Sequence, residues 1–165
     1  MAAHDRIVVG GDTTPAASAA LLWAVGEAAS RDGCDVLVVH AFDTAGRADL
    51  ALERDLDRAR RDARYRTQSW VVEVLGDSLV SVPVSVQTPD ATVEDALAAA
   101  SAHASMVVVG VPQTGRRQGL VPVLKGRCRC PVVTIGTGRS PAAPDEDGPG
   151  QALVPLRSAG STLSP

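Results

Sequence analysis

The residues best suited to chemistry lie in two glycine-containing segments, each of which follows a short apolar run. The first segment is GGDTTP, residues 10–15, and the second is GVPQTGRRQG, residues 110–119. Gly10 and Gly110 would let the backbone approach a ligand closely. Asp12 offers a carboxylate that could bind a ribose hydroxyl, an amide or a magnesium ion. Together the two segments predict a site for a small anionic ligand.

The second segment would hold the anionic part of that ligand. Phosphate oxygens need several backbone N–H donors, which glycines and the N-terminus of a helix supply. The candidates here are Thr114, Gly115 and Arg116, and the guanidinium group of Arg117 could add charge. Residues 96–144 contain no Asp or Glu but several basic side chains, which would attract anions over about 8 Å. An ordinary solvated patch remains the alternative.

Two of the polar residues near this site also have ordinary structural interpretations. Asp12 could turn the chain or cap the helix that follows it, because a short acidic side chain does both. His40 ends another apolar run and could be a hydrogen-bonded histidine at the end of a strand. The sequence alone leaves both interpretations open.

The elements that must position these residues alternate between strands and helices. Four continuous apolar runs, which are typical of buried parallel strands, predict strands at residues 6–10, 35–42, 106–110 and 131–136. One alternating run, which is typical of an edge strand, predicts a fifth strand at residues 82–87. Helical spacing and capping signals predict helices at residues 16–31 and 47–75, another opening at Thr92 with Val93 and Leu97 inward, and a short one at 119–125. This order predicts a doubly wound α/β fold, with a parallel sheet between two helical layers. Ligands bind such sheets beyond the carboxyl ends of the strands.

The composition limits the class of protein. The net charge of −3 is too acidic for a strongly basic nucleic-acid coat, and the site region lacks aromatic residues for base stacking. The odd number of cysteines argues against a disulfide framework, and Cys128 and Cys130 have no further Cys or His pair nearby to complete a metal site. No apolar run approaches the roughly 20 residues that cross a bilayer, and no signal peptide is evident. We therefore expect a cytoplasmic protein without membrane contact.

The chain divides into one predicted domain and a tail. Residues 1–137 hold all the predicted strands and helices. Residues 138–165 are rich in Gly, Pro, Ser and Ala and carry an acidic cluster, so they would bury too little apolar surface to order themselves. We expect this tail to be disordered.

Three stretches of the sequence resemble the universal stress protein (UspA-type) family. They are RIVVGGDTTPAASAALLWAVGEAA, DVLVVHAFD and ASMVVVG…CPVVTIG, which together span residues 6–136. The resemblance implies the adenine nucleotide alpha hydrolase-like fold, with five parallel strands in the order 3-2-1-4-5. It also implies a homodimer formed through the segment PVVTI, which starts at Pro131 and ends at Ile135. In one branch of the family it implies bound ATP.

The resemblance assigns roles to individual residues. Asp12 matches the family aspartate near the nucleoside, Ala41 matches a residue that lines the adenine, and Gly110 matches the first glycine of the phosphate motif. The rest of that motif departs from the family pattern. Gln113 stands where the second glycine would be, and Pro112 lacks an N–H donor. The sequence thus keeps the nucleoside side of the family site and loses much of the phosphate side.

Two functions follow from these observations. The first is a non-catalytic, dimeric interaction or regulatory module of the stress response with weak or absent ATP binding. The alternative is a regulator that binds ATP, AMP or another adenine nucleotide through Asp12 and the loop that starts at Gly110 and ends at Gly119. An enzyme is not expected, because one carboxylate and one histidine without an evident nucleophile or metal cluster do not make a catalytic set.

Overall fold

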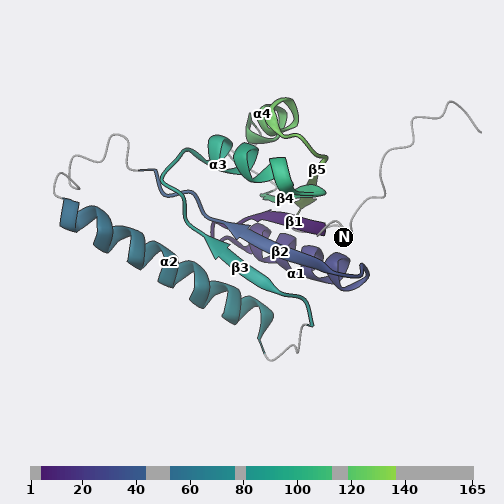
Figure 1. Cartoon of the computed structure of the whole chain (residues 1–165), viewed down its shortest axis with the longest axis horizontal. Coiled ribbons are helices and arrows are strands. Elements are labelled where there is room, and N and C mark those ends of the chain that lie inside the picture. Colours follow the sequence, from purple (N-terminus) through teal and green to yellow (C-terminus); the bar gives the residue numbers. More distant parts are fainter. Residues whose placement is uncertain (1–4, 44–52, 77–80, 113–118, 137–165) are drawn as a thin grey trace, which may run out of the picture.

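In the computed structural model, which describes residues 5–43, 53–76, 81–112 and 119–136, a parallel sheet forms the centre of the molecule (Figure 1). The strands are β1 Asp5–Gly10, β2 Cys34–Val39, β3 Val84–Gln87, β4 Met106–Val111 and β5 Val132–Gly136. They pair in the order β3-β2-β1-β4-β5. Both the predicted parallel sheet and the order implied by the resemblance are confirmed.

The burial of each strand follows its place in the sheet. Every residue of β2 is buried, which explains its continuous apolar sequence. β3 lies at an edge, and its residues alternate between half-buried and exposed. β5 lies at the other edge with Ile135 buried and Thr134 exposed. The apolar run of β2 and the alternating run of β3 therefore indicated the correct environments, whereas the apolar run of β5 lies at an edge.

Helices cover both faces of the sheet (Figure 1). α1 Pro15–Ala29 and α2 Glu53–Leu75 pack on one face, where Trp70 and Val71 of α2 join the core of α1. α3 Val93–Ala100, its short continuation η2 Ser101–His103, and α4 Leu120–Arg127 lie on the other face. Among the residues that the structure describes, no helix is long and apolar enough to cross a membrane.

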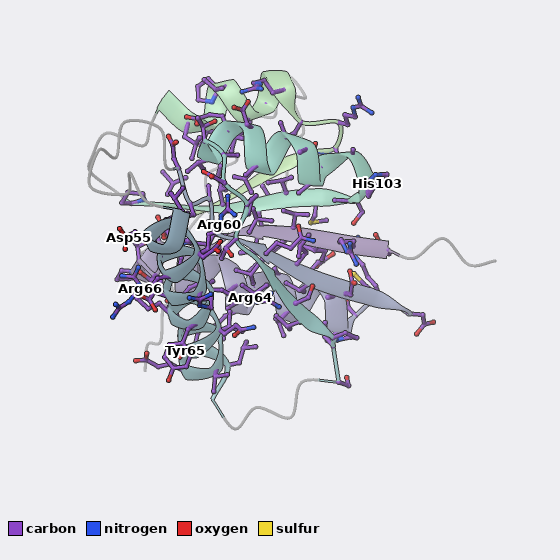
Figure 2. The ribbon with its side chains drawn as sticks, turned by 60° about the vertical axis from the view of Figure 1, so that its left-hand side comes forward. Asp55, Arg60, Arg64, Tyr65, Arg66 and His103 are labelled. Atoms are coloured by element: carbon purple, nitrogen blue, oxygen red, sulfur yellow. The ribbon has the colours of Figure 1, made fainter. Side chains whose placement is uncertain are left out.

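The two long helices agree with the periodicity of their sequences. Along α2, Ala63, Thr67 and Trp70 are buried, whereas Tyr65 and Arg66 point away from the sheet into solvent (Figure 2). The predicted first turn of this helix, residues 47–52, falls outside the described residues, as does the tail. In α1, the face toward the sheet consists mainly of small residues: Ala16, Ala17, Ala20, Leu21, Ala24, Val25 and Ala28.

The start of α3 differs in one respect from its prediction. Thr92 caps the helix as expected, since its hydroxyl accepts a hydrogen bond from the backbone N–H of Asp95 at 3.2 Å. Leu97 is buried, but Val93 is 43% exposed rather than inward. Val93 belongs to the first turn of the helix, which stands at the carboxyl end of the sheet, so its side chain borders a surface hollow there.

The first turn of α1 lies directly against the sheet at Gly110, near the end of β4. A Cβ atom at this position would lie 2.2 Å from the carbonyl carbon and oxygen of Ala16 and 2.5 Å from the nitrogen of Ala17. Real side chains do not tolerate such distances to backbone atoms. Gly110 is therefore required because the first turn of α1 rests directly on the backbone of β4.

We predict that Gly110→Ala lowers the free energy of unfolding by about 2–3 kcal/mol, because the backbone of α1 must move to admit a methyl group. Gly26→Ala is the control: Gly26 is exposed within α1, and a Cβ there meets nothing within 4 Å. That change should raise stability by up to about 1 kcal/mol through helix propensity. Urea unfolding measures both. Equal stability of Gly110→Ala and the parent protein would show that α1 does not rest on β4 in this way.

Candidate functional site

A cavity of about 140 Å³ opens at the carboxyl end of the sheet. It lies between the ends of β1, β2 and β4 and is closed on one side by the first turns of α3 and α4. Its lining residues are Gly10, Gly11, Asp12, Val39, His40, Ala41, Val93, Leu97, Val109, Gly110 and Leu120. This is the crevice that the fold predicts between neighbouring strands of an open parallel sheet. Pockets that enclose whole small molecules measure about 300–1,000 Å³, so this cavity has room for one ring of a ligand.

The structure brings together the sequence-predicted residues that it describes. Gly10, Asp12, Ala41 and Gly110 all line the cavity, although they lie at or after the ends of three strands that are far apart in the sequence. The predicted anion-binding residues Thr114, Gly115 and Arg116 lie outside the described residues. Their part in the site remains a prediction.

Asp12 has a structural role in the loop before α1. Its Oδ1 accepts hydrogen bonds from the backbone N–H of Thr14 at 3.1 Å and from the Thr14 hydroxyl at 2.5 Å. Thr14, rather than Asp12, caps the helix, because its hydroxyl oxygen accepts a hydrogen bond from the N–H of Ala17 at 3.2 Å. Asp12 therefore turns the chain while it also borders the cavity.

His40 is hydrogen-bonded at the end of β2, in agreement with the ordinary structural interpretation of this residue. Its Nδ1 donates a hydrogen bond to the backbone carbonyl of Gly11, in the loop that follows the neighbouring strand β1. His40 still contributes to the cavity wall. Thr13, between Gly11 and Thr14, has a φ of +60°, which is unusual for a residue with a β-branched side chain.

The three glycines of the site are not equivalent. A Cβ on Gly10 would face Val109 and Leu97, which both line the cavity. A Cβ on Gly11 would instead lie 2.6 Å from Cγ1 of Val38, and one on Gly110 would collide with α1. Contact with α1 already requires glycine at position 110, so the expectation that Gly110 admits a ligand stays a prediction. Gly10 is the glycine whose missing side chain leaves space on the cavity side.

The apolar wall of the cavity was not assigned to the site from the sequence. Val39 ends β2, and Val109 lies two residues before the end of β4. Val93 and Leu97 lie one turn apart on α3, and Leu120 starts α4. No motif marks these residues as binding residues. Their apolar periodicity indicated only that some of them face inward, and the topology then brings them to the cavity. An apolar wall opposite a carboxylate suits a flat ring that carries a polar substituent.

The backbone of Ala41 supplies the polar groups on the β2 side. The N–H groups of His40 and Phe42 donate to the carbonyls of Gln87 and Pro89 at 2.9 and 2.8 Å, so these residues direct their backbone groups toward β3. Ala41, between them, directs its N–H and C=O to the opposite side, where the cavity lies. Within the part of the chain that the structure describes, neither group has a backbone partner. A donor and an acceptor therefore stand side by side at the cavity.

Among the described residues, no group with a shifted pKa lines the cavity. A hydrogen bond from Ser105 and the nearby Arg31 lower the pKa of Asp5 at the start of β1, and burial raises the pKa of the Cys34 thiol. Burial likewise raises the pKa of the Cys130 thiol. Within the described ranges, no three His, Cys, Asp or Glu side chains gather closely enough to hold a metal ion.

Solved structures with the same fold come from distant organisms. A universal stress protein from Archaeoglobus fulgidus superposes with a TM-score of 0.58 at 23% identity, covering 79% of this chain and 93% of that one. Its complex with dAMP gives 0.59 at 22% identity, covering 81% and 98%. A universal stress protein family protein from Arabidopsis thaliana with AMP bound gives 0.55 at 14% identity, covering 80% and 91%. No curated protein sequence matches this chain significantly.

The family is settled by the sequence match. The model of the universal stress protein family matches residues 3–135, which include the described strands and helices up to Ile135 in β5. The same residues form the sheet order and the cavity described above. The chain belongs to the universal stress protein family.

Proposed function

We propose that this chain is a non-catalytic, homodimeric regulatory module of the stress response that binds the nucleoside part of an adenine nucleotide and gains little from its phosphates. The observation that carries this proposal is the unequal construction of the two halves of the site. The nucleoside half has a cavity with Asp12 and the backbone of Ala41. The phosphate half depends on the segment after β4 and on the N-terminus of α4.

The N-terminus of α4 is a poor anion site. The helix has 8 residues, and its N-cap residue Gly119 offers no side-chain cap hydrogen bond. Pro122 occupies the third helical position, so one amide donor of the first turn is missing. Pro112 removes another donor just after β4. Because phosphate recognition at such loops rests on converging N–H groups, ATP binding should be weak or absent.

The nucleoside half favours adenine. The edge of adenine presents an amino donor beside a ring-nitrogen acceptor, which complements the C=O and N–H of Ala41. The apolar wall of Leu97, Val109 and Leu120 suits the faces of a flat base. The AMP and dAMP bound to neighbours of the same fold agree with this ligand class.

The lining of the cavity supports a function other than catalysis. Among the residues that the structure describes, it holds one carboxylate, Asp12, and one imidazole, His40. Each is hydrogen-bonded to its own chain, Asp12 to Thr14 and His40 to Gly11. A nucleophile with an adjacent base, the minimum for covalent chemistry, is not among these residues.

A second candidate is a regulator that binds the phosphates through arginines instead of amides. The acid-free stretch 96–144 favours it, because Arg116 and Arg117 would follow β4 where the family motif has its phosphate loop. Guanidinium groups bind phosphate oxygens in pairs and can replace several N–H donors.

Calorimetric titration with adenosine, AMP and ATP separates the two candidates. We expect ATP to bind no more than about threefold more tightly than adenosine, because phosphates add little free energy here. The second candidate requires ATP to bind at least about tenfold more tightly, with the difference lost in Arg116→Ala/Arg117→Ala. A sub-micromolar dissociation constant for ATP would contradict the main proposal.

The homodimer would form at β5. This strand ends the sheet, and its apolar sequence would invite pairing with another strand unless it is covered. The N–H of Val107 donates to the carbonyl of Pro131 at 2.9 Å, so odd-numbered residues of β5 direct their backbone groups toward β4. Thr134 therefore directs its N–H and C=O outward, to the free edge, where a second copy could pair antiparallel.

We predict that Thr134→Pro converts a dimer into a monomer while the fold remains intact. Proline removes the outward N–H and blocks the edge, but it leaves the hydrogen bonds to β4 in place. Thr134→Val, which keeps the backbone donor, is the matched control and should stay dimeric. Light scattering at micromolar concentration gives the masses. A parent protein that is monomeric and unchanged by dilution would refute the dimer.

A further inference from the structure

The loop between β1 and α1, residues 11–14, is held in a conformation that its sequence does not favour. Thr13 has a φ of +60°, in the left-handed region that β-branched residues rarely enter. Such backbone persists where the surrounding structure imposes it, and it concentrates at binding sites. The neighbouring residue Gly11 makes the contacts that hold this loop against the sheet.

The peptide groups of Gly11 are fixed from two directions. Its N–H donates to the carbonyl of Val39 at 2.9 Å, and its own carbonyl accepts from Nδ1 of His40. Trp70 of α2 lies beneath the same residue, since a Cβ on Gly11 would be 3.3 Å from Cζ3 of the indole ring. Trp70 is itself anchored, because its Nε1–H donates to Oγ of Ser18 at 3.1 Å.

The bond from His40 connects the two polar walls of the cavity. A carbonyl oxygen only accepts, so Nδ1 of His40 carries the hydrogen. His40 directly precedes Ala41 in the chain, and Gly11 directly precedes Asp12. A single side-chain hydrogen bond thus links the end of β2 to the loop that carries the carboxylate.

We propose that His40 is a positioning residue of the nucleoside site, which fixes the place of the Asp12 carboxylate relative to the backbone of Ala41 through its hydrogen bond to Gly11. The inference rests on the proposed function, because the ligand group that Asp12 would bind is a ribose hydroxyl. The inference adds that recognition of the ribose by Asp12 depends on His40, which need not contact the ribose itself.

The test compares adenosine with 2′,3′-dideoxyadenosine, which lacks the ribose hydroxyls that Asp12 would bind. We expect the parent protein to bind adenosine about tenfold more tightly than the dideoxy compound, and His40→Leu to bring this ratio close to one. His40→Asn should retain the ratio, because its side-chain amide can donate to the same carbonyl. The proposal would be overturned if His40→Leu kept the parent's ratio of adenosine affinity to dideoxyadenosine affinity. That outcome includes the case in which both ligands bind more weakly by the same factor.

His103→Leu is the matched control. His103 is exposed at the end of η2, is not among the residues that line the cavity, and lies remote from α2 (Figure 2). This change removes an imidazole without touching the Gly11 loop. It should leave both affinities unchanged.

Amide hydrogen exchange in the ligand-free protein tests His40 independently of any nucleotide. The N–H of Thr14 donates to Asp12, so its exchange reports whether the loop keeps its conformation. We expect faster exchange at Thr14 in His40→Leu but not in His40→Asn or His103→Leu. If the parent protein binds neither nucleoside, the proposed function fails, and unchanged exchange at Thr14 would then reject the role of His40 as well.

Discussion

The contact on which the rest of this structure depends is the backbone contact between Gly110 and the first turn of α1. Two backbones meet there at distances that exclude any side chain. Beyond this point Ala20 and Ala24, both fully buried, continue the small-residue face of α1. Because α1 begins against the end of β4, the loop before it must pass over the ends of β1 and β4. That is where the cavity forms.

The same arrangement makes folding and binding residues hard to separate. Thr14 caps α1 and also holds Asp12, so the residue that starts the helix orients the carboxylate at the cavity. Gly110 lines the cavity but is glycine because of the helix. A substitution at either position would therefore change stability and ligand binding together, and loss of binding alone would not identify a ligand contact.

Much of the fold could be predicted from local sequence. Continuous apolar runs marked the strands because parallel strands between two helical layers are buried on both sides, and the spacing of Ala63, Thr67 and Trp70 marked the buried face of α2. Strand order came from the family resemblance, since short apolar runs do not specify their neighbours. Gly10, Asp12 and Ala41 could be assigned to one site because parallel strands end at the same edge.

The remaining features depend on geometry that no local pattern encodes. Val93 and Leu120 reach the cavity because the first turns of α3 and α4 lie over the ends of the strands. The position of these turns is set by the connections between the parallel strands. Either Asp12 or Thr14 could have capped α1, as both residue types cap helices. The hydrogen bond from His40 joins residues 29 apart in the sequence, and its existence follows from the β1–β2 register.

If the site binds a nucleotide as we propose, it is suited to report the concentration of that nucleotide rather than to hold a cofactor. Asp12 is hydrogen-bonded to Thr14, and Gly11 to His40, so contacts within the protein fix this part of the cavity wall. Binding at a concentration equal to the dissociation constant stabilises a protein by only about 0.4 kcal/mol. The fold would therefore be nearly as stable empty as occupied, and occupancy would follow the ligand's concentration. A tight phosphate cradle would remove that response, because the site would then remain filled at any cellular level of ATP.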